Sequence, residues 1–120
     1  MTLSPDIAAH IRQVMARLEV QRVLVFGSYA RGDYDAYSDL DVIIVYETER
    51  PFLERFRDFE ALFDLPMAVE LLAYTPAEFA AMVEAENPFI HHVLGEAIEL
   101  TMLDSSVKYS KDSGNKTQRI

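Results

Sequence analysis

The sequence predicts one small domain of the α/β (α+β) class, with a mixed sheet of three or four strands flanked by helices. Short apolar runs bounded by polar turns indicate the strands, and longer stretches with apolar residues at helical spacing alternate with them. The chain has 120 residues, which is the size of a single domain with one core. No apolar run reaches the roughly 20 residues of a membrane span, so no membrane attachment is expected.

The first elements are a helix and a strand. Ser4 and Pro5 are typical of a helix start. The apolar stripe of that helix consists of Ile7, Ile11, Val14, Met15 and Leu18. Residues 22–26 are almost continuously apolar, which predicts a short strand with both faces covered.

A turn and a second strand follow. Gly27 and Ser28 turn the chain into a short helix over residues 29–31. A polar loop over residues 33–38 then leads to a second strand, expected over residues 39–46.

The middle of the chain predicts an aromatic helix and a third strand. Pro51 opens the helix, in which phenylalanines recur near helical spacing and are expected to pack into the core. They are Phe52, Phe56, Phe59 and Phe63. Residues 68–74 then form the third strand.

Two more helices are predicted after this strand. Thr75, Pro76 and Glu78 form a capping box, and Phe79, Met82 and Val83 are expected to face inward. A helix beginning at Asn87-Pro88 is expected to bury Ile90, Val93, Leu94, Ala97 and Ile98. A short edge strand over residues 100–103 would complete the sheet.

The charge of the chain is strongly acidic, with a net value of −9. Duplex nucleic acid is normally bound by a basic face, so direct nucleic-acid binding is not expected. Acidic balance instead suits solubility, a basic protein partner or bound divalent metal, and it does not choose among them. The chain has no cysteine, which excludes disulfides and thiolate metal sites and fits a cytoplasmic protein.

The last residues differ from the rest. Residues 1–103, the predicted domain, contain seven arginines, no lysine and eighteen acids. Residues 104–120 contain all three lysines and are polar without apolar periodicity, so this tail is expected to be disordered. The sudden use of lysine also suggests sequence that was added to the natural protein.

The segment VLVFGSYARGDYDAYSDLDVIIVY holds the candidate site. Asp39 and Asp41 lie at the start of the second strand, where residues two apart project from one face. Two carboxylates held side by side repel each other unless a cation neutralises them, and Mg²⁺ prefers such oxygen ligands together with substrate phosphate. Asp33 and Asp35 lie in the loop and are expected to shape the turn.

The turn before this loop is a candidate phosphate site. Gly27 allows a phosphate to approach the backbone, and the Ser28 hydroxyl and the free N–H groups of the helix start can hold it. Arg31 either adds a contact to phosphate or pairs with the neighbouring aspartates.

These residues match a family pattern. Gly27-Ser28, ten intervening residues and Asp39-x-Asp41 form the G-S-x10-D-x-D pattern of the polymerase-β-like nucleotidyltransferases. Over about residues 5–103 the chain resembles a minimal nucleotidyltransferase (MNT) protein. The resemblance implies that family's fold.

The resemblance also implies an ATP-dependent active site with two Mg²⁺ ions. Asp39 and Asp41 would hold both ions. Glu70, in the third strand, would be the third acidic ligand and accept the proton of the attacking hydroxyl, although aspartate is commoner at this position. Gly27, Ser28 and Arg31 would bind the nucleotide phosphates.

The function that the resemblance implies is that of an antitoxin. MNT proteins accompany a HEPN-domain ribonuclease toxin and transfer AMP from ATP to a tyrosine of that toxin, so a homo- or hetero-oligomer is expected. Two alternatives remain. The protein could inhibit its partner by binding alone, or could transfer AMP to a small hydroxylated molecule such as an aminoglycoside.

Two further residue types remain open. The tyrosines near the site, Tyr29, Tyr34, Tyr37 and Tyr46, are candidates either for stacking on a base or for covering the loop. The histidines His10, His91 and His92 have no metal-ligand spacing and are interpreted as surface or partner-contact residues.

Overall fold

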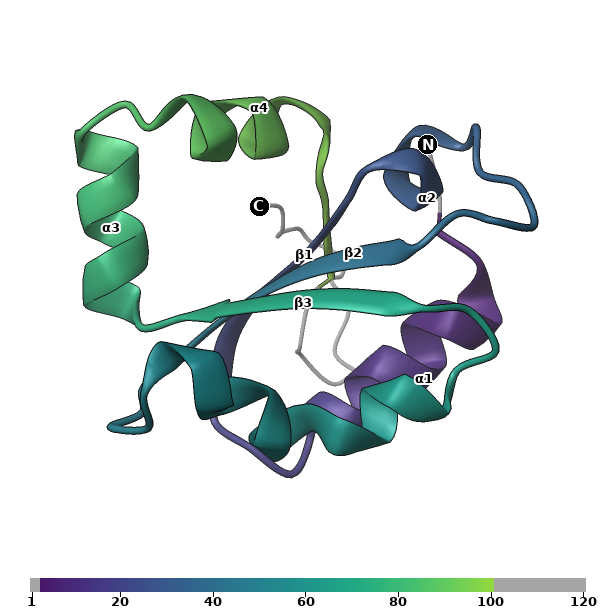
Figure 1. Cartoon of the computed structure of the whole chain (residues 1–120), viewed down its shortest axis with the longest axis horizontal. Coiled ribbons are helices and arrows are strands. Elements are labelled where there is room, and N and C mark those ends of the chain that lie inside the picture. Colours follow the sequence, from purple (N-terminus) through teal and green to yellow (C-terminus); the bar gives the residue numbers. More distant parts are fainter. Residues whose placement is uncertain (1–2, 101–120) are drawn as a thin grey trace, which may run out of the picture.

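A four-stranded mixed sheet with helices on both faces forms the protein (Figure 1), and the fold class expected from the sequence is confirmed. The computed structural model describes residues 3–100. The strands are β1 (Val20–Phe26), β2 (Leu40–Tyr46), β3 (Val69–Tyr74) and β4 (Ile98–Leu100), in the spatial order β3-β2-β1-β4. Strand β1 runs antiparallel to both β2 and β4, whereas β2 and β3 are parallel.

The helices form two layers around the sheet. Helix α1 (Pro5–Met15) and the 3₁₀ helix η1 (Phe52–Asp64) cover one face, and α3 (Pro76–Glu84) and α4 (Pro88–Glu96) lie on the other (Figure 1). A single helical turn, α2 (Ser28–Arg31), joins β1 to the loop before β2.

Alternation along the strands divides the buried side chains between these layers. On β2, Val42 and Ile44 belong to the core with α1 and η1, while Ile43 and Val45 belong to the core with α3 and α4. All four are at most 2% exposed, because β2 is an inner strand covered on both faces. A residue two positions before Ile43 therefore points to the α3–α4 side.

The strands differ from the expected ranges mainly at their ends. Strand β1 begins two residues earlier than expected and β2 one residue later. The edge strand β4 was expected over residues 100–103 and lies instead at Ile98–Leu100, paired with Val23–Val25 of β1. Residues 101–103 and the tail over 104–120 lie outside the described residues.

The prediction that the phenylalanine stripe packs into the core is wrong for three of its four members. Phe59 is fully buried, but Phe52, Phe56 and Phe63 are 41%, 43% and 43% exposed. The segment is a 3₁₀ helix with about three residues per turn, so residues spaced for an α-helix spread around its axis. Non-helical backbone angles at Phe59 further divide the segment.

The α3–α4 layer also buries fewer residues than expected. Phe79, Ile90 and Val93 are buried against the sheet, but Val83 and Leu94 are 43% and 42% exposed. Only one side of each short helix packs against the strands, and within residues 3–100 no further layer covers the other side.

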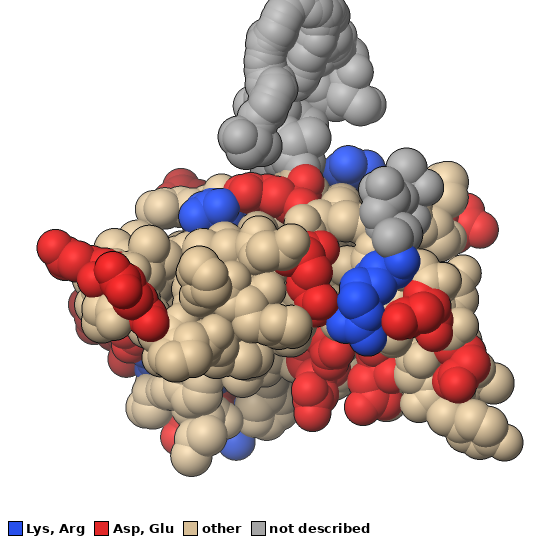
Figure 2. Space-filling model, turned by 90° about the horizontal axis from the view of Figure 1, so that it is seen from above, with Lys and Arg blue, Asp and Glu red and all other residues tan. Residues whose placement is uncertain are grey.

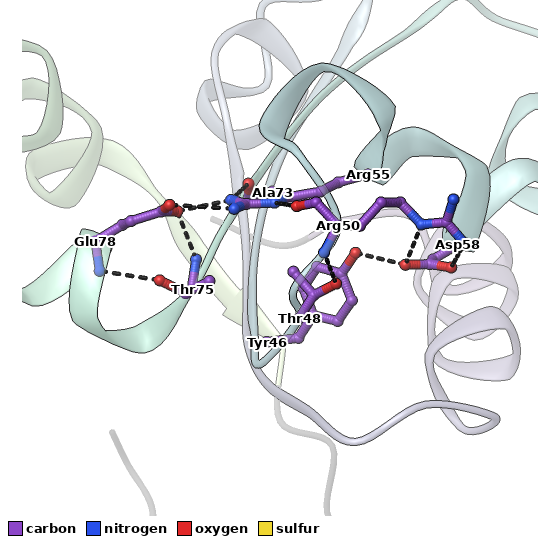
Figure 3. Close-up of polar contacts among 8 residues, drawn as sticks. All are labelled: Tyr46, Thr48, Arg50, Arg55, Asp58, Ala73, Thr75 and Glu78. Atoms are coloured by element: carbon purple, nitrogen blue, oxygen red, sulfur yellow. Dashed lines mark hydrogen bonds and ion pairs between the residues drawn. The ribbon is translucent and has the colours of Figure 1, made fainter.

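A buried arginine links η1 to the start of α3 (Figure 3). Arg55 donates to both carboxylate oxygens of Glu78, at 2.6 and 3.1 Å, and to the carbonyls of Ala73 and Arg50. Glu78 also completes the predicted capping box with Thr75. The pKa of Glu78 is lowered to about 2, chiefly by the hydrogen bonds from Arg55 and then by the Thr75 backbone.

In the described part of the chain, no helix has both the length and the apolar character needed to cross a lipid bilayer.

Candidate active site

A pocket of about 460 Å³ opens where β1 ends and β2 and β3 begin, beneath α4. The sequence-predicted site residues Gly27, Ser28, Arg31, Asp39, Asp41 and Glu70 all line it. The other lining residues are Phe26, Phe89, His92 and Glu96. The structure thus brings together in one pocket every residue that the sequence pattern selected.

Strand register places two of the carboxylates side by side. Asp41 pairs with Glu70 across the parallel strands β2 and β3. Residues paired in this way project from the same face, and that face is the α3–α4 side. Asp39 comes one residue before β2 begins and lines the same pocket.

The surroundings of the Asp41 carboxyl disfavour its charged form and raise its pKa. Burial, a hydrogen bond with Glu70 and the charges of Glu70 and Asp39 raise the pKa of Asp41 to about 6, against a small opposing effect of Arg31. A carboxyl in this setting binds either a proton or another cation near neutral pH.

Gly27 fits closely against Asp41. Its backbone angles, φ 76° and ψ −155°, lie in a region that only glycine adopts readily. A Cβ on Gly27 would also overlap the Asp41 Oδ2 atom. The backbone angles therefore favour glycine where β1 turns into α2, and a larger residue there would also have to displace the Asp41 carboxyl.

Arg31 is paired with carboxylates from two directions. Its Nε donates to Asp33 at 3.3 Å, and its Nη1 donates to Glu96 at 3.1 Å. Of the two interpretations open from the sequence, pairing with an aspartate is the contact present. Arg31 nevertheless lines the pocket and remains 46% exposed, so its guanidinium can be reached by an incoming anion.

Helix α4 provides a pocket wall that the sequence analysis missed. Phe89, His92 and Glu96 lie three and four residues apart and so share one face of the helix. The Phe89 ring is fixed edge-on against Phe26, with ring centroids 5.7 Å apart. Only this helical spacing hinted at a shared role, because packing alone brings α4 over the end of β1.

Glu96 makes the closest contacts of this wall. Its Oε2 accepts a hydrogen bond of 2.7 Å from the backbone N–H of Gly27. Its Oε1 lies 3.1 Å from Arg31 and 3.5 Å from the His92 ring.

The donor set fits a hard divalent cation. Within residues 3–100 no three Asp, Glu or His side chains are already closed around a metal position. Asp41 and Glu70 nevertheless lie side by side on paired strands, Asp39 lines the same pocket, and oxygen ligands of this kind suit Mg²⁺. Figure 2 shows several acidic patches on this face of the molecule, grouped around a basic patch.

The tyrosines fall into different environments. Tyr29 is buried and stacks on Tyr34, with ring centroids 4.2 Å apart, whereas Tyr37 is 93% exposed in the loop. Tyr46 lies at the far end of β2, where its hydroxyl donates to Asp58 at 2.6 Å (Figure 3). None of these rings lines the pocket.

The histidines also separate. The His10 ring contacts the Ala61 carbonyl at 2.9 Å and so links α1 to η1. His91 is exposed, while the largely exposed His92 lines the pocket beside Glu96.

Comparison with known proteins defines the class. A family model for the nucleotidyltransferase domain matches residues 8–100. A solved chain described as "Structure of putative minimal nucleotidyltransferase" is 30% identical, with a TM-score of 0.55 over 76% of this chain and 86% of that one. This protein therefore belongs to the nucleotidyltransferase domain family, and the resemblance to minimal nucleotidyltransferases is confirmed.

Named relatives give a narrower indication. The chain is 36% identical over 73 residues to "Putative protein adenylyltransferase MJ0604" of Methanocaldococcus jannaschii, an alignment covering 61% of this chain and 62% of that protein. It is 37% identical over 54 residues to "Protein adenylyltransferase MntA" of Thermococcus cleftensis, covering 45% of this chain and 54% of that protein. The matched stretch thus spans less than two thirds of either relative.

The fold also recurs in a toxin–antitoxin structure. A chain in the "Crystal structure of the toxin-antitoxin with AMP-PNP" superposes with a TM-score of 0.61 over 82% of this chain and 76% of that chain. The identity is 18%, so this likeness concerns the fold.

Proposed function

We propose that this protein transfers AMP from ATP to a hydroxyl group of a partner protein and thereby neutralises that partner. The partner that we infer is a HEPN-domain ribonuclease toxin, and the acceptor is a tyrosine hydroxyl. The observation that carries the proposal is the pairing of Asp41 with Glu70 in register, directly beside the Gly27 turn.

The pocket contains the two kinds of group that this chemistry requires. Carboxylates on β2 and β3 can hold a divalent cation, and the Gly27-Ser28 turn with Arg31 offers donors to phosphate. These groups lie side by side in the lining of one pocket, so a triphosphate can contact both at once. The matching family model and the relatives named as protein adenylyltransferases support the same reaction class.

The proposed reaction is one in-line displacement. The acceptor hydroxyl oxygen attacks the α-phosphorus of ATP and forms a new P–O bond. The bond from that phosphorus to the β,γ-pyrophosphate breaks, and pyrophosphate leaves. Glu70, which is exposed at the pocket edge, accepts the hydroxyl proton. Asp39, Asp41 and Glu70 would hold Mg²⁺, which would supply charge stabilisation for the phosphate oxygens.

A protein acceptor suits the shape and charge of the site. The pocket is open at the end of the sheet, and exposed apolar side chains lie on α4 at Phe89 and Leu94. The net charge of −9 favours a basic partner over a nucleic acid. The toxin–antitoxin structure that shares this fold is consistent with a protein partner.

The test is a transfer assay with a matched charge control. The protein is incubated with α-labelled ATP and Mg²⁺, with and without the protein encoded beside it, and each chain is weighed by intact mass spectrometry. Asp39→Asn/Asp41→Asn removes the proposed ligands. Glu47→Gln/Glu49→Gln removes two exposed acids with the same spacing beyond the opposite end of β2.

We expect one AMP on the partner with the wild type and the Glu47/Glu49 variant, and none with the Asp39/Asp41 variant. Binding of the unmodified partner by all three proteins, with no transfer by any, would instead favour inhibition by binding alone. Labelling of an aminoglycoside but of no protein would refute the protein acceptor.

A further inference from the structure

The Glu96 carboxylate lies on the groups that the proposed function gives to phosphate. It accepts a hydrogen bond of 2.7 Å from the Gly27 N–H and pairs with the Arg31 guanidinium at 3.1 and 3.3 Å. Its side chain is only 14% exposed, so these protein groups replace most of its contact with water. A carboxylate that accepts from one backbone N–H and one guanidinium uses donors that a phosphate oxygen would use.

Glu96 remains an anion in this position. Burial raises the pKa of a carboxyl, but the Gly27 N–H and Arg31 outweigh this effect, and the pKa of Glu96 lies below its usual value. The pocket already contains Asp39, Asp41 and Glu70, so a fourth carboxylate is unfavourable unless specific donors hold it.

We propose that Glu96 is an internal competitor of the nucleotide phosphate: it occupies the Gly27 N–H and the Arg31 guanidinium in the free protein and leaves them when a nucleotide binds. This inference rests on the proposed function, because it takes the Gly27–Arg31 side of the pocket as the phosphate side. It assigns Glu96 a role in setting nucleotide affinity, without contact to the reacting atoms.

The structure provides an alternative place for the displaced side chain. The ring of His92, one turn earlier on α4, lies 3.5 Å from Glu96 and is 68% exposed. A small rotation of the Glu96 side chain can therefore move its carboxylate toward His92 and solvent while α4 stays in place. Such an exchange keeps the donors satisfied in both states, with an internal anion in one and a phosphate in the other.

The test measures binding of the non-hydrolysable analogue AMP-PNP with Mg²⁺ by calorimetry. Glu96→Gln keeps the side-chain length and removes the charge, and Glu96→Ala removes the competitor altogether. Asp33→Asn is the matched control, because Asp33 pairs with the same arginine but is 63% exposed and has no contact with Gly27. Circular dichroism verifies that each variant is folded.

We expect both Glu96 variants to bind AMP-PNP about tenfold more tightly than the wild type, which corresponds to about 1.4 kcal/mol. The control should differ from the wild type by less than about threefold, because an exposed ion pair contributes little. Weaker or unchanged binding by the folded Glu96 variants would overturn the inference and indicate that Glu96 holds Arg31 in place for the nucleotide. An Asp33→Asn control that gains as much affinity for AMP-PNP as Glu96→Gln would also overturn the inference. Removal of any negative charge near the pocket would then explain the tighter binding.

A second measurement uses the wild type alone and does not depend on the variants folding. The Gly27 amide resonance should move when AMP-PNP and Mg²⁺ are added, because its hydrogen-bond acceptor changes. Nucleotide binding that leaves this resonance unmoved would overturn the inference but not the proposed function. If neither the wild type nor any folded variant binds AMP-PNP, the proposed function itself fails.

Discussion

Two glycines, Gly27 in the pocket lining and Gly95 on helix α4, provide a sharp test of the local geometry. Gly27 has φ 76° and ψ −155°, and a Cβ there would overlap Asp41 Oδ2. Gly95 lies within α4, and a Cβ there would meet no other group of the described chain within 4 Å beyond its own turn of helix. Substitution by alanine should therefore change the free energy of unfolding in opposite directions at the two positions.

The expected magnitudes follow from these contacts. Alanine held in the positive-φ conformation of Gly27 lowers the free energy of unfolding by about 1–3 kcal/mol, and its overlap with Asp41 lowers it by about 1–3 kcal/mol more. The sum, about 2–6 kcal/mol, is a large share of a total stability that is typically about 5–15 kcal/mol. Gly95→Ala should stabilise by up to about 0.5–1 kcal/mol, because alanine favours the helix without new contacts.

Urea unfolding followed by circular dichroism measures both effects. A double-mutant cycle separates the two costs at Gly27: in an Asp41→Ala background, the overlap disappears and only the backbone cost remains. A Gly27→Ala protein within about 0.5 kcal/mol of the wild type would refute the geometry, since an ordinary exposed substitution falls in that range. An equal cost with and without Asp41 would refute the overlap alone.

Further predictions concern the charged groups. Glu78→Ala should lower the free energy of unfolding by about 2–3 kcal/mol, because it leaves the buried Arg55 without its carboxylate; the cost is below the roughly 3–5 kcal/mol of a fully buried pair because the Glu78 side chain is 44% exposed. Urea unfolding at pH 7 measures this loss, and Glu84→Ala, an exposed acid at the end of α3, is the control that should change little. The wild type should also lose stability as the pH falls from about 4.5 to about 2, because the folded pKa of Glu78 is depressed to about 2 from 4.5; a Glu78→Gln protein with the same acid slope would contradict this assignment. The pKa of Asp41 is shifted in the opposite direction, to about 6 in the folded protein from 3.8. Metal-free wild type should therefore lose stability as the pH rises from about 3.8 to about 6, whereas Asp41→Asn should not. Mg²⁺ should raise the melting temperature of the wild type more at pH 7 than at pH 5, where a proton competes, and should leave Asp39→Asn/Asp41→Asn unchanged; an equal shift in both proteins would place the ion elsewhere.

The sequence was sufficient to predict the order of elements and the carboxylate side of the site. Asp39 and Asp41 are close in the chain, and the strand after them is apolar enough to identify its period. The family resemblance called for a third acid on a following strand, and Glu70 is the only acid in the third strand. The parallel register places it opposite Asp41. Here local pattern and tertiary structure agree.

Other features were not predictable because they depend on long-range packing or on helix type. The Glu96–Gly27 contact joins residues 69 positions apart, and no local pattern indicates that the end of α4 reaches the end of β1. The phenylalanines of η1 were assigned to the core from a period of 3.6, whereas the segment adopts the tighter 3₁₀ geometry. The spacing of apolar residues predicts which side of a helix is buried only when the number of residues per turn is known.

The division of the sheet into two faces has a practical consequence for handling the protein. None of the residues lining the pocket belongs to α1 or η1, which cover the opposite face of the sheet. Exposed positions of α1, such as Ala9 and Gln13, are therefore suitable attachment points for a dye or a solid support. Protein immobilised through them would present its open pocket to the solution, and surface-based binding measurements could be made without a linker near the reacting groups.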